Sequence, residues 1–126
     1  QGYGLKSGAV ATSISHDSHN IIVVGTSEAD MAAAVNRVVE LNGGIVVWDG
    51  GQPIAEVPLA IAGIMSDEPL VDVNEKLETA KEKAFELGVS RGIDPFMTLS
   101  FMALPVIPSL RITTRGVFDV NSQSYV

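Results

Sequence analysis

The chain has 126 residues, of which 46% are hydrophobic and 18% are charged, and its formal net charge is −7. This length and apolar content suit one domain over residues 1–126, while the acidic balance argues against binding to nucleic-acid phosphates or anionic lipids. No apolar run approaches the roughly 20 residues of a membrane span, and the lack of cysteine excludes disulfides and thiolate metal sites, so we expect a soluble cytoplasmic protein.

Two strands and a helix are predicted in the first third of the chain. Residues 10–15 alternate between two sets of side chains, which is the period of a half-buried strand, and residues 21–24 are a β-branched run typical of a buried one. Ser27 favours a helix start, because its side chain can cap the first turn and acidic residues follow it. Apolar residues then recur at spacings of three and four until Asn42 and two glycines end the helix.

A hairpin and a second helix are predicted next. Residues 45–48 and 52–57 flank an Asp-Gly-Gly turn, whose residues tolerate a positive φ. Ser66 is the predicted cap of a helix that ends at Gly88. One face of this helix is apolar, and the other carries a run of charges that indicates a solvated surface.

The last third of the chain is apolar at first and then polar. Residues 96–104 indicate a central strand that is apolar on both faces, residues 110–113 suggest an edge strand, and a mostly polar tail follows from Asp119. The resulting order ββαββαβ predicts an α/β (α+β) fold, with a mixed β-sheet packed with two main helices.

Polar side chains are concentrated in SISHDSHN, residues 13–20, between the first two predicted strands. Both histidines of the chain, His16 and His19, lie here with Asp17. In a regular strand the two imidazoles would point to opposite faces, whereas a turn at Asp17 and Ser18 would bring them together. An H-x-x-H pair still lacks the further ligand of a catalytic zinc site, which Asp17 could supply.

Three interpretations of this segment therefore stay open. It is a self-contained metal site, the structural end of a hairpin, or a loop that presents polar groups to another surface or a substrate. A Ser-His-Asp triad is disfavoured, because residues adjacent in sequence rarely reach its linear geometry. Outside this segment, no P-loop, dinucleotide fingerprint or metalloprotease helix occurs.

Three motifs in order resemble one known family. They are GAVATSISHDSHNIIVVG at residues 8–25, MSDEP at residues 65–69 and FMALPVIP at residues 101–108. Together they resemble the C-terminal domain of bacterial adenine deaminase, and the resemblance covers nearly the whole chain. The start on Gln1 rather than methionine also suggests a segment of something longer.

The resemblance implies an amidohydrolase-superfamily enzyme that converts adenine and water to hypoxanthine and ammonia. Such enzymes hold Mn or Fe in a (β/α)₈ barrel of about 250 residues, where the metal activates the attacking water. None of that barrel lies in this chain, so we expect a fragment that is inactive alone. Its expected partners are its own barrel domain, adenine as the substrate of the whole enzyme, and further copies in a homo-oligomer.

The resemblance also bears on the polar segment, whose five candidate residues are Ser15, His16, Asp17, His19 and Asn20. We expect this loop to face the barrel and to help close the active site, without assigning a catalytic residue to any of them. The alternative is a purely structural or oligomerisation module, with residues 96–104 and the prolines that follow packed on the barrel or a second subunit.

Overall fold

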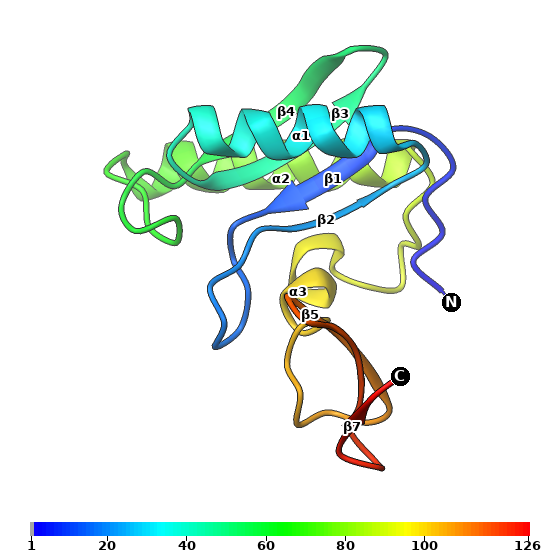
Figure 1. Ribbon diagram of the computed structural model, residues 1–126. Helices are drawn as coiled ribbons and strands as arrows, with labels where there is room; N and C mark the ends of the chain where they lie inside the picture. The colour runs from blue at the N-terminus through cyan, green and yellow to red at the C-terminus, as the bar shows by residue number, and fades with distance from the viewer. Residues whose placement is uncertain (1) are drawn as a thin grey trace.

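The main sheet of the protein has four strands, as a computed structural model describing residues 2–126 shows. They are β1 (Ala9–Thr12), β2 (Ile22–Gly25), β3 (Gly44–Asp49) and β4 (Gln52–Pro58), in the order β2-β1-β3-β4. Each neighbouring pair is antiparallel, so two hairpins lie side by side with β1 and β3 at the centre. Figure 1 shows the helices α1 and α2 on opposite faces of this sheet.

Helix α1 (Glu28–Glu40) covers one face of the sheet. Ser27 caps it as predicted, because its Oγ accepts a hydrogen bond from the Asp30 N–H at 3.1 Å. The interface is built mainly from small side chains, which allow the helix backbone to approach the strands closely. Its buried members are Ala9, Ala11, Ala34, Val38 and Val46.

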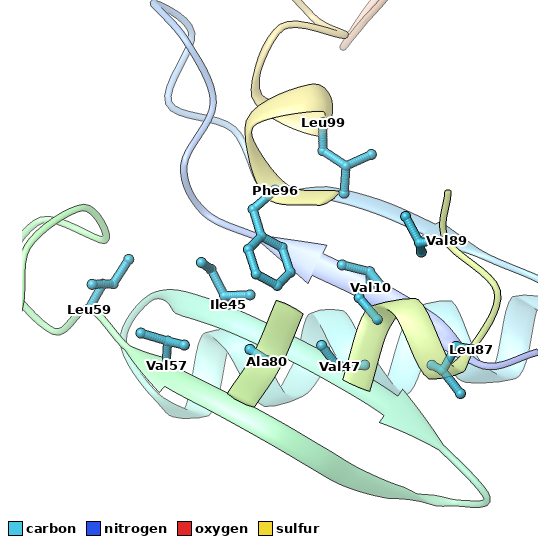
Figure 2. Close-up of a cluster of buried hydrophobic side chains, with 11 residues drawn as sticks. Val10, Ile45, Val47, Val57, Leu59, Ala80, Leu87, Val89, Phe96 and Leu99 are labelled. Carbon is cyan, nitrogen blue, oxygen red and sulfur yellow. The ribbon is translucent and has the colours of Figure 1, made fainter. Parts of the chain in front are cut away.

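The second face carries the larger core, beneath α2 (Leu70–Glu86) and α3 (Pro95–Ser100). Figure 2 shows the Phe96 ring directed from α3 toward Val10 and Ile45 of the sheet. The same cluster includes buried side chains from both helices and three strands, among them Val47, Val57, Ala80, Ala84 and Leu99. Because α2 and α3 share this cluster, the segment that follows the second helix is held against the sheet.

The α+β class and the first six predicted elements are confirmed. The strand predicted over residues 96–104 is wrong, since α3 and a turn occupy this part of the chain. The cause lies just before it: Asp94 Oδ1 accepts hydrogen bonds from the Phe96 and Met97 N–H groups, both at 2.9 Å, and Pro95 fills the first helical turn. The cap and the proline together favour a helix over a strand.

The predicted start of α2 at Ser66 is also wrong. The helix begins at Leu70 after Pro69, while Ser66 Oγ accepts a hydrogen bond from the Glu68 N–H at 3.2 Å in the preceding turn. A helix that started at Ser66 would have to include Glu68, the residue before Pro69. The proline ring disfavours the helical conformation of that residue, so the helix starts after Pro69.

A second, three-stranded sheet forms the C-terminal part: β5 (Leu110–Thr113), β6 (Gly116–Asp119) and β7 (Ser124–Tyr125). The predicted strand at residues 110–113 is confirmed, but the predicted tail from Asp119 includes β7, whose Tyr125 ring packs edge-on against Phe118 at 5.2 Å. In Figure 1 this small sheet extends from α3, away from α1 and α2. No helix within residues 2–126 has the length and hydropathy to cross a membrane.

The helical form of residues 95–100 predicts very different effects for two neighbours. Phe96→Ala removes a ring that is only 5% exposed and should lower the free energy of unfolding by about 3–5 kcal/mol. Met97→Ala, at a side chain 53% exposed, should lower it by about 0.5 kcal/mol or less. Denaturant titrations followed by Trp48 fluorescence measure both, and equal losses would contradict the helical arrangement.

Candidate functional site

The candidate site is the loop that joins β1 to β2. It contains all five predicted residues, and the structure divides them by exposure. Ser15 is buried, Asn20 is half-buried, and His16, Asp17 and His19 are exposed. The loop therefore has an internal part that fixes its backbone and an outer part that meets solvent.

Ser13 fixes the base of the loop. Its Oγ donates to the Gly63 carbonyl at 2.5 Å and accepts from the Gly44 N–H at 2.8 Å, at a position that is 9% exposed. The contact requires glycine at Gly43, where φ is +114° and an added Cβ would collide with the Gly63 Cα. This junction joins the end of β1 to the start of β3 and to the connector after β4.

A tight turn follows at residues 15–19. The His19 N–H donates to the Ser15 carbonyl at 3.3 Å, and the Ser15 and Ser18 hydroxyls lie 2.8 Å apart. Asp17 and His19 have φ values of 69° and 51°, in the left-handed region that Asp and His tolerate better than most residues. The outer side chains are thus displayed on an internally bonded backbone.

His16 connects this turn to the far end of the sequence. Its N–H donates to the Ser100 carbonyl at 2.8 Å, and its ring stacks on Phe101 with the centroids 5.2 Å apart and the planes at 27°. Both partners lie at the end of α3. The helix that replaces the predicted strand therefore sets the position of His16.

A shallow hollow of about 250 Å³ opens between the loop and the C-terminal sheet. Of the predicted residues His16, Asp17 and Asn20 line it, whereas His19 and Ser15 do not. Sequence reasoning missed its opposite wall, which includes Thr113 and Thr114. Nothing in the local sequence links these threonines to the loop, because the hollow exists only once the turn between β5 and β6 lies beside it.

The hollow combines an imidazole, a carboxylate, an amide and hydroxyls, and such a set can donate and accept hydrogen bonds to a polar heterocycle. Within residues 2–126 no three His, Cys, Asp or Glu side chains are placed so that they could hold a metal ion. The described residues therefore do not fit a self-contained metal centre, and no step of the chemistry is assigned to a metal bound here.

A larger hollow, about 520 Å³, lies between β4 and α2 and is lined mainly by acidic side chains. Three of the five charged side chains that line it, Glu56, Glu68 and Lys76, take part in ion pairs. Glu56 accepts from Arg37 Nε at 2.6 Å and Nη2 at 3.0 Å, an arrangement that raises the pKa of Arg37, and Glu68 pairs with Lys76. This hollow is a solvated ion-pair surface, so the loop remains the stronger candidate.

Comparison with known proteins places the chain beside one family. Residues 1–124 match the family model described as the adenine deaminase C-terminal domain. The adenine deaminase of Bacillus subtilis (strain 168) is 51% identical over 126 residues, which is 100% of this chain and 22% of that protein. That of Brucella anthropi is 54% identical over 125 residues, covering 99% of this chain and 22% of the relative. The chain thus spans about a fifth of the length of these curated relatives.

The two roles of the loop serines predict unequal effects. Ser13→Ala leaves the buried Gly44 N–H and Gly63 carbonyl without their partner and should lower the free energy of unfolding by about 1–3 kcal/mol. Ser18 is itself exposed, and Ser18→Ala removes a single, part-buried hydroxyl contact, the one with Ser15, so it should cost about 1 kcal/mol or less. Thermal or denaturant unfolding compares the two variants, and a Ser18 effect as large as that of Ser13 would contradict the assignment.

Proposed function

Because the chain belongs to the adenine deaminase C-terminal domain family, we propose that it serves an enzyme that hydrolyses adenine to hypoxanthine and ammonia. The relatives are named adenine deaminases, which supports this reaction, as do the three motifs that resemble the family. The proposal places the polypeptide in purine metabolism, in the cytoplasm, as a hydrolase.

The chemical step belongs, in this proposal, to the larger part of the polypeptide that the chain does not include. A metal ion there, Mn or Fe, would lower the pKa of a bound water and supply hydroxide at neutral pH. Within residues 2–126 no group of side chains is placed to hold a metal ion. In this proposal the domain assists the catalytic part of the polypeptide, and the isolated domain is predicted to be inactive.

The observation that carries the proposal is the rigid display of polar side chains by the loop. Hydrogen bonds from Ser13, the turn at residues 15–19 and the His16–Ser100 contact fix the backbone, while His16 and Asp17 stay exposed beside the hollow. A preorganised group loses little entropy when it binds a ligand. We therefore assign the loop the task of closing the active site and hydrogen-bonding the edge of the purine.

Assembly is a second candidate function, favoured by apolar side chains at the surface of the C-terminal sheet. Leu110, Ile112 and Val117 are all exposed, and Ile112 lies opposite Val117 in the sheet; apolar side chains that adjoin at a surface mark interaction sites. In this alternative the domain holds the barrel or a second copy in a homo-oligomer, and the loop has no role at the active site. Turnover measured in loop variants separates the two candidates.

His16→Ala in the full-length polypeptide should lower kcat for adenine by about tenfold or more, since the loss of one hydrogen bond worth about 1.4 kcal/mol in the transition state has that effect. His16→Phe keeps the aromatic stacking on Phe101 but removes the ring nitrogens, so it should be about as slow as His16→Ala. Ammonia release under saturating adenine measures both variants.

Asn36→Ala serves as the control, because Asn36 is an exposed polar residue on α1, away from the loop. It should retain the kcat of the unmodified enzyme. The unfolding transition should stay unchanged in Asn36→Ala and His16→Phe, whereas His16→Ala loses the stacking on Phe101 and should be destabilised by about 1 kcal/mol. Wild-type kinetics in both His16 variants would refute the active-site role and favour assembly.

A further inference from the structure

β2 is the open edge of the main sheet. Among the described strands it pairs with β1 alone, and it lies at the side of the sheet nearest to α3 and the C-terminal strands (Figure 1). The Thr26 N–H donates to the Gly8 carbonyl at 3.0 Å, just beyond the end of the two strands. Hydrogen-bonded and non-hydrogen-bonded pairs alternate in an antiparallel ladder, so Val24 and Ile22 are the residues of β2 whose backbone groups bond to β1. The backbone groups of Val23 and Gly25 consequently face away from β1, toward the open edge.

The two edges of the sheet differ in their protection against further strand pairing. β4 carries Pro53, Pro58 and the ion-paired Glu56, and its register with β3 shifts between Val47 and Trp48. Prolines, charges and bulges are the devices that keep an edge strand from recruiting another strand. The sequence of β2 is Ile-Val-Val-Gly, which contains none of them.

An uncharged groove runs along this unprotected edge. It consists of two adjoining hollows of about 410 and 300 Å³, which share four lining residues: Ile22, Val23, Met102 and Ile112. No residue that lines either hollow carries a charge, although the chain as a whole has a net charge of −7. An open strand edge beside apolar walls is the arrangement that accepts an added strand.

One end of the groove is lined by Gly2 and Tyr3. Tyr3 is held in place, because its hydroxyl donates to the Pro95 carbonyl at 3.1 Å and its carbonyl accepts from the Ser90 N–H at 2.8 Å. Burial also raises the pKa of the Tyr3 hydroxyl, with Asp94 contributing, so it remains a donor at neutral pH. In the relatives most of the polypeptide lies outside the matched region, which is a C-terminal domain, and therefore precedes this point.

We propose that the groove along β2 binds an extended, uncharged segment of the same polypeptide, from the part that precedes this domain, as a fifth strand of the sheet. A segment joined to the chain beside Tyr3 by a short linker would have an effective concentration of the order of millimolar, which favours it over a second copy. The other end of the groove reaches Asn20 and Thr114, which also line the hollow at the polar loop. The added strand would thus fix this loop against the rest of the enzyme. The inference depends on family membership and not on the reaction.

Hydrogen exchange of the full-length polypeptide tests the added strand. The outward-facing Val23 and Gly25 amides should exchange at least about tenfold more slowly than unprotected amides, as expected for amides in a strand ladder. Ile112→Lys places a charge in the groove and should accelerate both by about tenfold or more, while the inward-facing Val24 amide keeps its protection. Free exchange of Val23 and Gly25 in the unmodified protein would overturn the proposal.

Val39→Lys is the matched control, because Val39 on α1 is 59% exposed and Ile112 is 61% exposed. The control variant should leave the exchange of Val23 and Gly25 unchanged. Equal acceleration in both variants would indicate general destabilisation and would count against a segment bound in the groove.

Photo-crosslinking identifies the occupant. With Ile112 replaced by p-benzoylphenylalanine in the full-length polypeptide, the main crosslink should join position 112 to a residue preceding this domain within the same polypeptide. In a mixture of isotopically light and heavy protein, crosslinks between the two labels would identify a second copy and overturn the choice of occupant. Neither hydrogen exchange nor crosslinking uses adenine. A negative result in these experiments therefore does not affect the active-site role tested with His16, and wild-type kinetics of the His16 variants do not affect the added strand.

Discussion

Complete burial of β1 is the constraint on which the rest of the structure depends. All four of its residues have no exposed surface. Ala9 and Ala11 face α1, where a larger side chain would push the helix away from the sheet, and Val10 faces the core under α2 and α3. Thr12 is buried as well, and its Oγ1 accepts from the Ile14 N–H at 3.0 Å, so its hydroxyl has a partner. The buried clusters on the two faces of the sheet, one under α1 and one under α2 and α3, therefore both include side chains of β1.

The candidate site follows directly from that strand. The chain leaves β1 at Ser13, which links the strand ends through Gly44 and Gly63, and the polar turn begins two residues later. The loop contacts the end of α3 through His16, and α3 is packed on the same sheet face as Val10. The polar groups are thus supported from both sides by the core. A loop anchored in this way can hold its exposed side chains in fixed positions.

The groove along β2 differs in charge from the surface formed by α2 and β4. Many of the acidic and basic residues lie on α2 and beside β4, where several form ion pairs, as Lys81 does with Glu78 and Arg37 of α1 with Glu56 of β4. The edge of β2 and the walls beside it are uncharged. Removing a charged side chain from water costs free energy, whereas removing an apolar one from water is favourable. The uncharged side is therefore the one suited to become buried in a larger protein.

By itself, the sequence determined the local elements with strong periodic or turn signals and the identity of the polar loop. β1, β2, α1 and the hairpin of β3 and β4 were predicted because alternation, β-branched runs, a serine cap and an Asp-Gly-Gly turn act over a few residues. Residues 96–104 were misread, because a short apolar run has the same composition in a buried strand and a buried helix. Only the tertiary structure decided which loop residues are internal and which face outward, and it alone brought Thr113 and Thr114 to His16. It also left the edge of β2 open, since these arrangements depend on contacts between residues far apart in the chain, which no local pattern encodes.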